Sequence, residues 1–220
     1  MGFLFRSIAK TGPFSTYNMN ITTDYNIVLL PSTDLTRHII TASLGVSSQA
    51  DSFFTLQQGC CYPHVSLYML RLDRSVHNQP QMILDKLGNE FAIVSMKAEK
   101  YCYARGYMDI EYSPTDMVRN VQDKVLDAFQ PIRNITSEDD ELEQEPMGVT
   151  KKQYYAAYGY PNIKELFRPH VTLTRYKSDS FRPVHVPPIE AWHGSFDKIA
   201  LCERGAHGTS IKVVHSVTLH

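Results

Sequence analysis

Two stretches of the chain repeat the same order of apolar and polar positions. Residues 25–43 and residues 107–129 each read as a strand, a turn and a helix. Both turns carry the order Thr-Asp-apolar-X-Arg, beginning at Thr33 and Thr115, and a Thr or Asp at such a junction can cap the first turn of a helix. The second helix has an i, i+4 apolar stripe that predicts packing on a sheet, formed by Met117, Val121, Val125 and Phe129.

The rest of the chain alternates the same two kinds of element. Strand-like segments follow residues 64 and 170, one in each half. The remaining segments are a helix near 82–87 and strands at 91–96, 195–201 and 210–219. This alternation predicts an α/β or α+β protein built from pseudo-twofold duplicated strand–helix units. We expect one bilobal domain over residues 1–220, with a first lobe at about 25–100 and a second at about 101–219.

Each half contains one copy of a histidine–apolar–hydroxyl–apolar tetrapeptide. The copies are His64-Val65-Ser66-Leu67 and His170-Val171-Thr172-Leu173, each directly after a proline. Side chains alternate between the two faces of a strand, so the histidine and the hydroxyl of each copy share a face. Continued alternation predicts Tyr68 and Thr174 on the histidine faces, where they would bind substrate, and Arg175 on the opposite face.

The paired motifs point to acid–base chemistry at a phosphate. Histidine is the side chain that titrates near neutral pH, so two of them supply a general acid and a general base. Hydroxyl donors stabilise the charge that develops on phosphate oxygens. Arg168 flanks the second motif and is a further candidate phosphate ligand. Either histidine alone would be better interpreted as a structural residue, whereas the pair favours catalysis.

Other chemistries find little support in the sequence. His185, His193 and His207 lie in a loop-rich region without the spacing of metal ligands, and we expect them at the surface. The chain contains no P-loop, dinucleotide-binding or HExxH pattern. We therefore expect neither a metal nor a cofactor.

Composition and charge narrow the class of substrate. The chain is 43% hydrophobic and 20% charged, as in ordinary globular proteins. A formal net charge of -1 disfavours binding of long nucleic acid, which needs a basic surface. It favours a small nucleotide, an oligonucleotide or an RNA end as substrate. No apolar run approaches a membrane span, and the four cysteines form no disulfide framework. We expect a cytoplasmic monomer.

The second half is longer because of an insertion at residues 137–160. It begins with an acidic run at 137–145, which we interpret as a solvated surface loop, with a flap near the site as the alternative. A Lys- and Tyr-rich stretch follows at 151–160. Its tyrosines either stack on bases or pack a helix against the sheet.

The paired motifs in two similar halves resemble the two-histidine (2H) phosphoesterase superfamily, which includes 2'-5' RNA ligase-like proteins and cyclic nucleotide phosphodiesterases. The resemblance covers roughly residues 25–219. It implies a bilobal fold whose antiparallel-rich sheets form a central active-site cleft, with no required metal. It also implies that His64 and His170 are the acid–base pair and that Ser66 and Thr172 bind phosphate oxygens. Ser66 replaces the commoner threonine and keeps the hydroxyl donor.

The leading hypothesis is a metal-independent phosphodiesterase that cleaves 2',5'-linked or cyclic phosphodiesters of small nucleotides or RNA ends. One alternative is the reverse reaction, 2'-5' ligation or end processing of RNA. Another is a nucleotide- or RNA-binding module without turnover. The sequence leaves open which histidine acts as base and which as acid.

Overall fold

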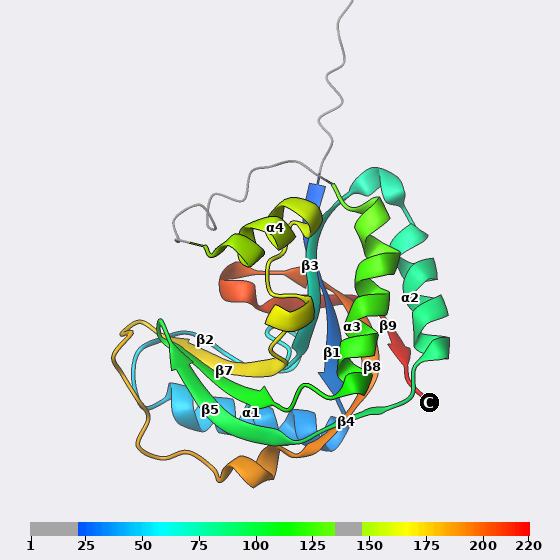
Figure 1. Cartoon of the computed structure of the whole chain (residues 1–220). Coiled ribbons are helices and arrows are strands. Elements are labelled where there is room, and N and C mark those ends of the chain that lie inside the picture. Colours follow the sequence, from blue (N-terminus) through cyan, green and yellow to red (C-terminus); the bar gives the residue numbers. More distant parts are fainter. Residues whose placement is uncertain (1–21, 135–146) are drawn as a thin grey trace, which may run out of the picture.

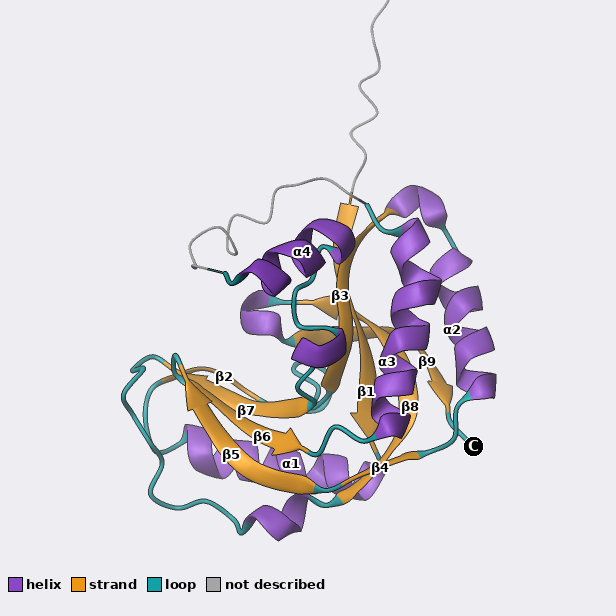
Figure 2. Cartoon of the chain, in the orientation of Figure 1, coloured by secondary structure: helices purple, strands orange, loops and turns teal. Residues whose placement is uncertain are grey.

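The structure is a computed structural model that describes residues 22–134 and 147–220. Two antiparallel sheets form its framework (Figure 2). The first has the order β3 (Val65–Asp73), β1 (Thr22–Pro31), β8 (Gly194–Arg204) and β4 (Val94–Met96), and β9 (Ser210–Thr218) also pairs with β8. The second has the order β2 (Ser52–Thr55), β7 (His170–Tyr176), β6 (Tyr107–Tyr112) and β5 (Ala98–Ala104). The predicted α+β class with antiparallel sheets is confirmed.

The helices pack on the two sheets (Figure 1). They are α1 (Thr33–Ser47), α2 (Gln79–Glu90), α3 (Asp116–Phe129) and α4 (Val149–Tyr158). Short 3₁₀ turns occur at Arg74–Val76, Gln130–Ile132, Lys164–Leu166, Ile189–Trp192 and Ala206–Gly208. Helix α1 contacts β7 and β2 of the second sheet, whereas α3 contacts β3 and α2 contacts β8 and β9 of the first sheet. No helix in the described ranges is long and apolar enough to cross a membrane.

The two halves of the chain exchange elements between the sheets. Strand β2 comes from the first half and joins the second sheet, and β8 and β9 come from the second half and join the first. The helices are exchanged in the same way, since α1 covers the sheet that holds β7 and α3 covers the sheet that holds β3. Both lobes expected near 25–100 and 101–219 therefore contribute strands to both sheets.

The predicted helix starts differ in their capping. Helix α3 begins as expected, because Thr115 Oγ1 accepts a hydrogen bond from the Val118 amide at 3.3 Å. Helix α1 begins at Thr33, one residue earlier than the pattern implied, and its N-cap residue Ser32 makes no side-chain bond. The stripe predicted for α3 is confirmed at Val121, Val125 and Phe129, which are buried. It is wrong only at Met117, which is 48% exposed, while Val118 is buried in its place.

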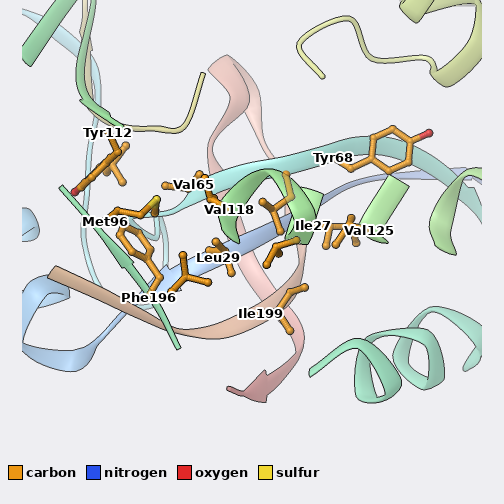
Figure 3. Close-up of a cluster of buried hydrophobic side chains, with 14 of the residues drawn as sticks. Ile27, Leu29, Val65, Tyr68, Met96, Tyr112, Val118, Val125, Phe196 and Ile199 are labelled. Atoms are coloured by element: carbon orange, nitrogen blue, oxygen red, sulfur yellow. The ribbon is translucent and has the colours of Figure 1, made fainter. Parts of the chain in front are cut away.

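The core lies between each sheet and its helices. Figure 3 shows its part under α3, which includes Ile27 of β1, Val118 and Val125 of the helix and Tyr68 of β3, whose ring points away from the other three. All four side chains are fully buried. One face of each sheet thus packs against helices. The opposite face of the first sheet carries a second, smaller apolar cluster, formed by Val28, Ala200 and Cys202.

The Tyr-rich stretch of the insertion forms α4, which lies beside β3 (Figure 1). Tyr154, Tyr158 and Tyr160 pack against the core, and the Tyr68 hydroxyl donates to the Tyr158 carbonyl at 2.7 Å. The tyrosines therefore follow the packing interpretation. The acidic run at 137–145 lies outside the described residues.

Candidate active site

Each motif strand contains a β-bulge directly after its hydroxyl residue. In the β1–β3 pair the register passes from Ser66 to Tyr68, and in the β6–β7 pair it passes from Thr172 to Thr174. A bulge adds one residue to one strand, so every side chain after it changes face. The two motifs therefore share a backbone feature, a bulge at the same position, in addition to their similar sequences.

A buried polar side chain from the helix behind the sheet binds each bulge. Gln122 of α3 donates Nε2–H to the Leu67 carbonyl at 3.0 Å, and Gln122 is 1% exposed. Ser43 of α1 is fully buried and donates its hydroxyl to the Leu173 carbonyl at 2.6 Å. A carbonyl buried at an irregular point of a strand needs such a donor. The helices thus stabilise the irregular strands that carry the motifs.

The bulges overturn the predicted positions of Tyr68 and Thr174. Tyr68 is fully buried in the core shown in Figure 3 and lies on the face opposite to Ser66. Thr174 is also fully buried, and its hydroxyl donates to the Phe54 carbonyl at 2.6 Å. The expectation that these two residues bind substrate is wrong, because simple alternation does not hold across a bulge.

The two motif histidines have matching hydrogen bonds. His64 Nδ1 lies 2.7 Å from the carbonyl oxygen of Tyr62, and His170 Nδ1 lies 2.7 Å from that of Arg168. A carbonyl oxygen only accepts, so in both rings Nδ1 carries a proton and Nε2 remains for other chemistry. Both side chains are half-buried. This arrangement suits a proton acceptor or donor at Nε2.

The electrostatics of His64 link it to His170. The pKa of His64 is lowered to about 4, mainly by loss of hydration and also by the charge of His170, against the raising effects of backbone groups at Tyr62 and Gly208. Residues of β3 and β7 approach within 8 Å, Cα to Cα. The fold therefore brings the two imidazoles close enough to interact.

The two motif hydroxyls have different partners. Ser66 Oγ accepts from Nδ2 of Asn26 at 2.8 Å, and Thr172 Oγ1 donates to Oδ1 of Asp109 at 2.7 Å. Asn26 is fully buried, and Asp109 is 4% exposed. Our sequence analysis missed both residues, although a polar side chain inside an otherwise apolar strand is the signal that could have identified them.

Arg168 lies beside the second motif in an ion-pair network. Its guanidinium donates to Asp109 Oδ2 at 3.0 Å and to Glu111 Oε2 at 2.9 Å. The thiol of Cys102 also donates to Glu111. Two carboxylates thus already compensate the charge of the candidate phosphate ligand.

The bulge in β7 places Arg175 on the face of His170 and Thr172, opposite to the expectation. The guanidinium carbon lies 4.7 Å from the ring centroid of Tyr107 and 5.2 Å from that of Phe53. Arg175 Nη1 donates to His207 Nδ1 at 2.8 Å. Within residues 22–134 and 147–220, Arg175 forms no ion pair with a carboxylate.

His207 does not have the simple surface role that we expected. Its ring lies 4.5 Å from that of Phe53, centroid to centroid, and it accepts from Arg175. The next residue, Gly208, has a backbone group that acts on His64. The turn at Ala206–Gly208 therefore connects Arg175 with the first histidine, a relation that only the fold creates.

A separate cavity of about 710 Å³ lies between α1 and the segment of residues 184–192. It is lined mainly by apolar side chains such as Ala42, Val46, Val186 and Trp192, with His38 and His185 at its border. None of the motif residues lines this cavity. This cavity is therefore distinct from the paired motifs.

Comparisons with known proteins agree with this fold. E. coli LigT complexed with 3'-AMP is similar over 90% of this chain and 99% of its own, with a TM-score of 0.57 and 10% identity. TT0787 of Thermus thermophilus is similar over 89% of this chain and 97% of its own, with a TM-score of 0.55 and 15% identity. A structure described as a phosphoesterase has a TM-score of 0.53, at 10% identity, over 90% of this chain and 99% of its own.

These likenesses confirm the fold predicted from the resemblance to two-histidine phosphoesterases. No curated protein matches the sequence. A family model described as "Protein of unknown function (DUF1045)" matches residues 80–200, which is more than half of the chain. The chain therefore belongs to the DUF1045 family.

Proposed function

We propose that this protein is a metal-independent phosphodiesterase that cleaves 2',5'-linked or cyclic phosphodiesters of small nucleotides or RNA ends. The observation that carries the proposal is the pair of equally anchored histidines, His64 and His170, whose rings interact electrostatically. The LigT structure of the same fold is a complex with 3'-AMP, which supports a nucleotide as ligand.

The surroundings of His64 support a role as the general base. Its pKa of about 4 keeps the ring neutral at pH 7, with the Nε2 lone pair available. In hydrolysis, Nε2 of His64 takes a proton from water as the water oxygen bonds to phosphorus. Protonated His170 donates its Nε2 proton to the leaving ribose oxygen as the old P–O bond breaks. The products are a phosphomonoester and a free hydroxyl, and exchange with solvent restores both rings.

The two imidazoles supply both proton transfers, so the proposed reaction needs no metal ion. Ser66 and Thr172 lie two residues beyond the histidines on the same faces, next to the position proposed for the phosphate. Arg168 orders the carboxylates beside His170 through its two ion pairs.

Arg175 extends the proposed site beyond the reacting phosphate. Its cationic group is held against the rings of Tyr107 and Phe53, and Phe53 is 48% exposed. A guanidinium between aromatic faces suits the base or a second phosphate of a nucleotide. This local cation also fits a small substrate better than long RNA, because the formal net charge is only -1.

A substrate panel tests the proposal. The protein is incubated with EDTA and with 2',5'- and 3',5'-linked oligonucleotides, cyclic dinucleotides and 2',3'-cyclic phosphates, and the products are separated by chromatography. We expect cleavage of a 2',5'-linked or cyclic member in the presence of the chelator. Binding without turnover of any member would indicate a binding module, and joining of RNA ends would indicate the ligase direction.

A further inference from the structure

We propose that the two motif hydroxyls have opposite hydrogen-bonding roles. Ser66 donates its proton to a phosphate oxygen of the substrate, whereas Thr172 has its proton held by Asp109 and serves only as an acceptor. Asn26 and Asp109 are the positioning residues that set this difference. The inference rests on the proposed function in one respect, namely that the ligand carries a phosphate.

The hydroxyl proton of Ser66 is available to a ligand, because the proton in the hydrogen bond between Asn26 and Ser66 comes from the Asn26 amide. A hydroxyl has one proton and two lone pairs, so accepting from Asn26 Nδ2 at 2.8 Å leaves the Ser66 O–H free to donate. Ser66 is only partly buried, so a ligand can reach it.

The orientation of the Asn26 amide follows from its burial. Asn26 is fully buried, and its Oδ1 has no hydrogen-bond partner. Exchanging the amide oxygen and nitrogen would instead leave two N–H donors without an acceptor. A buried unpaired donor is rarer and costlier than an unpaired carbonyl oxygen. The amide therefore donates to Ser66, and its unpaired acceptor beside the motif is a feature of a binding site rather than of a packed core.

Thr172 has the opposite polarity. A carboxylate only accepts, so in the 2.7 Å contact between Thr172 Oγ1 and Asp109 Oδ1 the proton comes from Thr172. The other carboxylate oxygen of Asp109 is held by Arg168 at 3.0 Å. Giving the Thr172 proton to a phosphate would leave its oxygen facing a carboxylate without a proton between them. The free lone pair of Thr172 suits a hydroxyl of water or ribose beside His170.

Phosphate affinity of two variants measures the difference directly. Inorganic phosphate is titrated into the full chain by calorimetry at pH 6, where it is mainly the monoanion. We expect Ser66→Ala to weaken binding by about 10-fold or more, as for a lost hydrogen bond to a charged group. Thr172→Val keeps the side-chain shape and should change binding by less than about 3-fold. Equal losses, a larger loss for Thr172→Val, or no phosphate binding to the native protein would overturn the inference.

A second pair of variants tests Asn26. Asn26→Asp replaces the donor by an acceptor that takes the Ser66 proton, and we expect it to weaken phosphate binding about as much as Ser66→Ala. Asn26→Ala removes the donor but leaves the Ser66 proton free, so binding should weaken clearly less than in Asn26→Asp. Equal effects of the two Asn26 variants would contradict the positioning role. Should Asn26→Asp fail to fold, the Ser66 and Thr172 variants still decide.

The double variant separates hydrogen-bond polarity from simple charge repulsion. In the Ser66→Ala background, Asn26→Asp should cost no further affinity, because no hydroxyl proton remains to be taken. An additional loss there would assign the effect to the new negative charge and would overturn the positioning role. Phosphate binding does not depend on turnover. The expected affinities without cleavage of any substrate would refute only the proposed function, and cleavage with equal affinities would refute only this inference.

Discussion

At the scale of single residues, the fold sets the proton affinity of the His64 imidazole. The rings of His64 and His170 both donate Nδ1–H to a carbonyl two residues before them. Burial nevertheless lowers the pKa of His64 to about 4. The tetrapeptide does not encode this shift, because it depends on how far the fold removes the His64 ring from water.

Removal of either imidazole should abolish most of the proposed activity. We expect His64→Ala and His170→Ala each to lower kcat/KM by about 10² to 10⁴ or more, the size of a lost general acid or base. Steady-state kinetics on the substrate identified by the panel measures this. His215→Ala is a matched control, since His215 contacts Asp85 at the surface. Near-native turnover of both motif variants would remove the basis of the assignment.

The lowered pKa of His64 predicts how the stability of the fold changes with pH. The folded state protonates His64 near pH 4, and the unfolded chain does so near 6.5, so the unfolded state binds the proton first as the pH falls. The stability linked to neutral His64 is complete above pH 6.5 and is lost toward pH 4, by roughly 2 to 3 kcal/mol.

Denaturant unfolding at pH 7 and pH 4.5 measures this loss. We expect the difference in the free energy of unfolding between pH 7 and pH 4.5 to be smaller by that amount in His64→Gln, which has no titratable group at this position. The His64 ring signals in an NMR titration should remain those of the neutral form down to about pH 5. A midpoint near 6.5 would contradict the assignment of His64 as the base.

A substitution of Arg175 should affect substrate binding but not the chemical step. We expect Arg175→Gln to raise KM by about 10-fold while changing kcat by less than about 3-fold, because the side chain lies beyond the motif residues. Lys177→Gln is the control, since Lys177 is exposed and pairs with Asp51. A loss in kcat with unchanged KM would assign Arg175 to the chemical step instead.

At the scale of elements, each motif strand depends on the helix behind it. The bulges of β3 and β7 occur where Gln122 of α3 and Ser43 of α1 bind the carbonyl oxygens of Leu67 and Leu173. The faces of the strands, and with them the positions of Arg175 and Tyr68, follow from these bulges.

Loss of the buried Ser43 hydroxyl should destabilise the protein. Ser43 Oγ donates to the Leu173 carbonyl and accepts from the Leu56 amide, so Ser43→Ala leaves two buried groups unpaired. We expect a loss of about 1 to 3 kcal/mol in the free energy of unfolding, measured with urea. Ser48→Ala, which removes an exposed hydroxyl bond to Gly45, should change it by less than about 0.5 kcal/mol. Equal effects would show that the buried bond does not support the bulge.

At the scale of the whole molecule, the last strand of the chain, β9, joins the first sheet and contacts α2, a helix from the other half. Strand β9 pairs with β8 and packs against α2. At the contact, a Cβ added to Gly88 would lie 2.3 Å from Cγ1 of Val217. A glycine is therefore required for the close approach of α2 to β9.

Filling this contact should weaken the docking of β9. We expect Gly88→Ala to destabilise the fold by about 1 to 3 kcal/mol through overpacking, and Val217→Ala to restore part of the loss in the double variant. Gly45→Ala is the matched control, because Gly45 is also within a helix but has no atom within 4 Å of the added Cβ. It should stabilise the protein by up to about 1 kcal/mol. Stabilisation by Gly88→Ala would contradict the close contact.

Local patterns were sufficient for the elements and for the paired motifs. Periods of two and of about 3.6 residues are properties of neighbouring positions, so the helices near 33 and 116 and the strands after 64 and 170 could be predicted. The two tetrapeptides likewise make His64, Ser66, His170 and Thr172 the candidate site residues without any knowledge of the fold.

Only the tertiary structure decided which side chains accompany those four residues. The bulges lie where Ser43 and Gln122, far away in the sequence, bind the carbonyls of β7 and β3. They place Arg175 on the face of the motif residues and Tyr68 and Thr174 in the core. The sheets exchange strands between the halves, which brings the turn with His207 to Arg175. Each of these outcomes depends on contacts between distant segments, whereas periodicity reports only on the nearest neighbours of a residue.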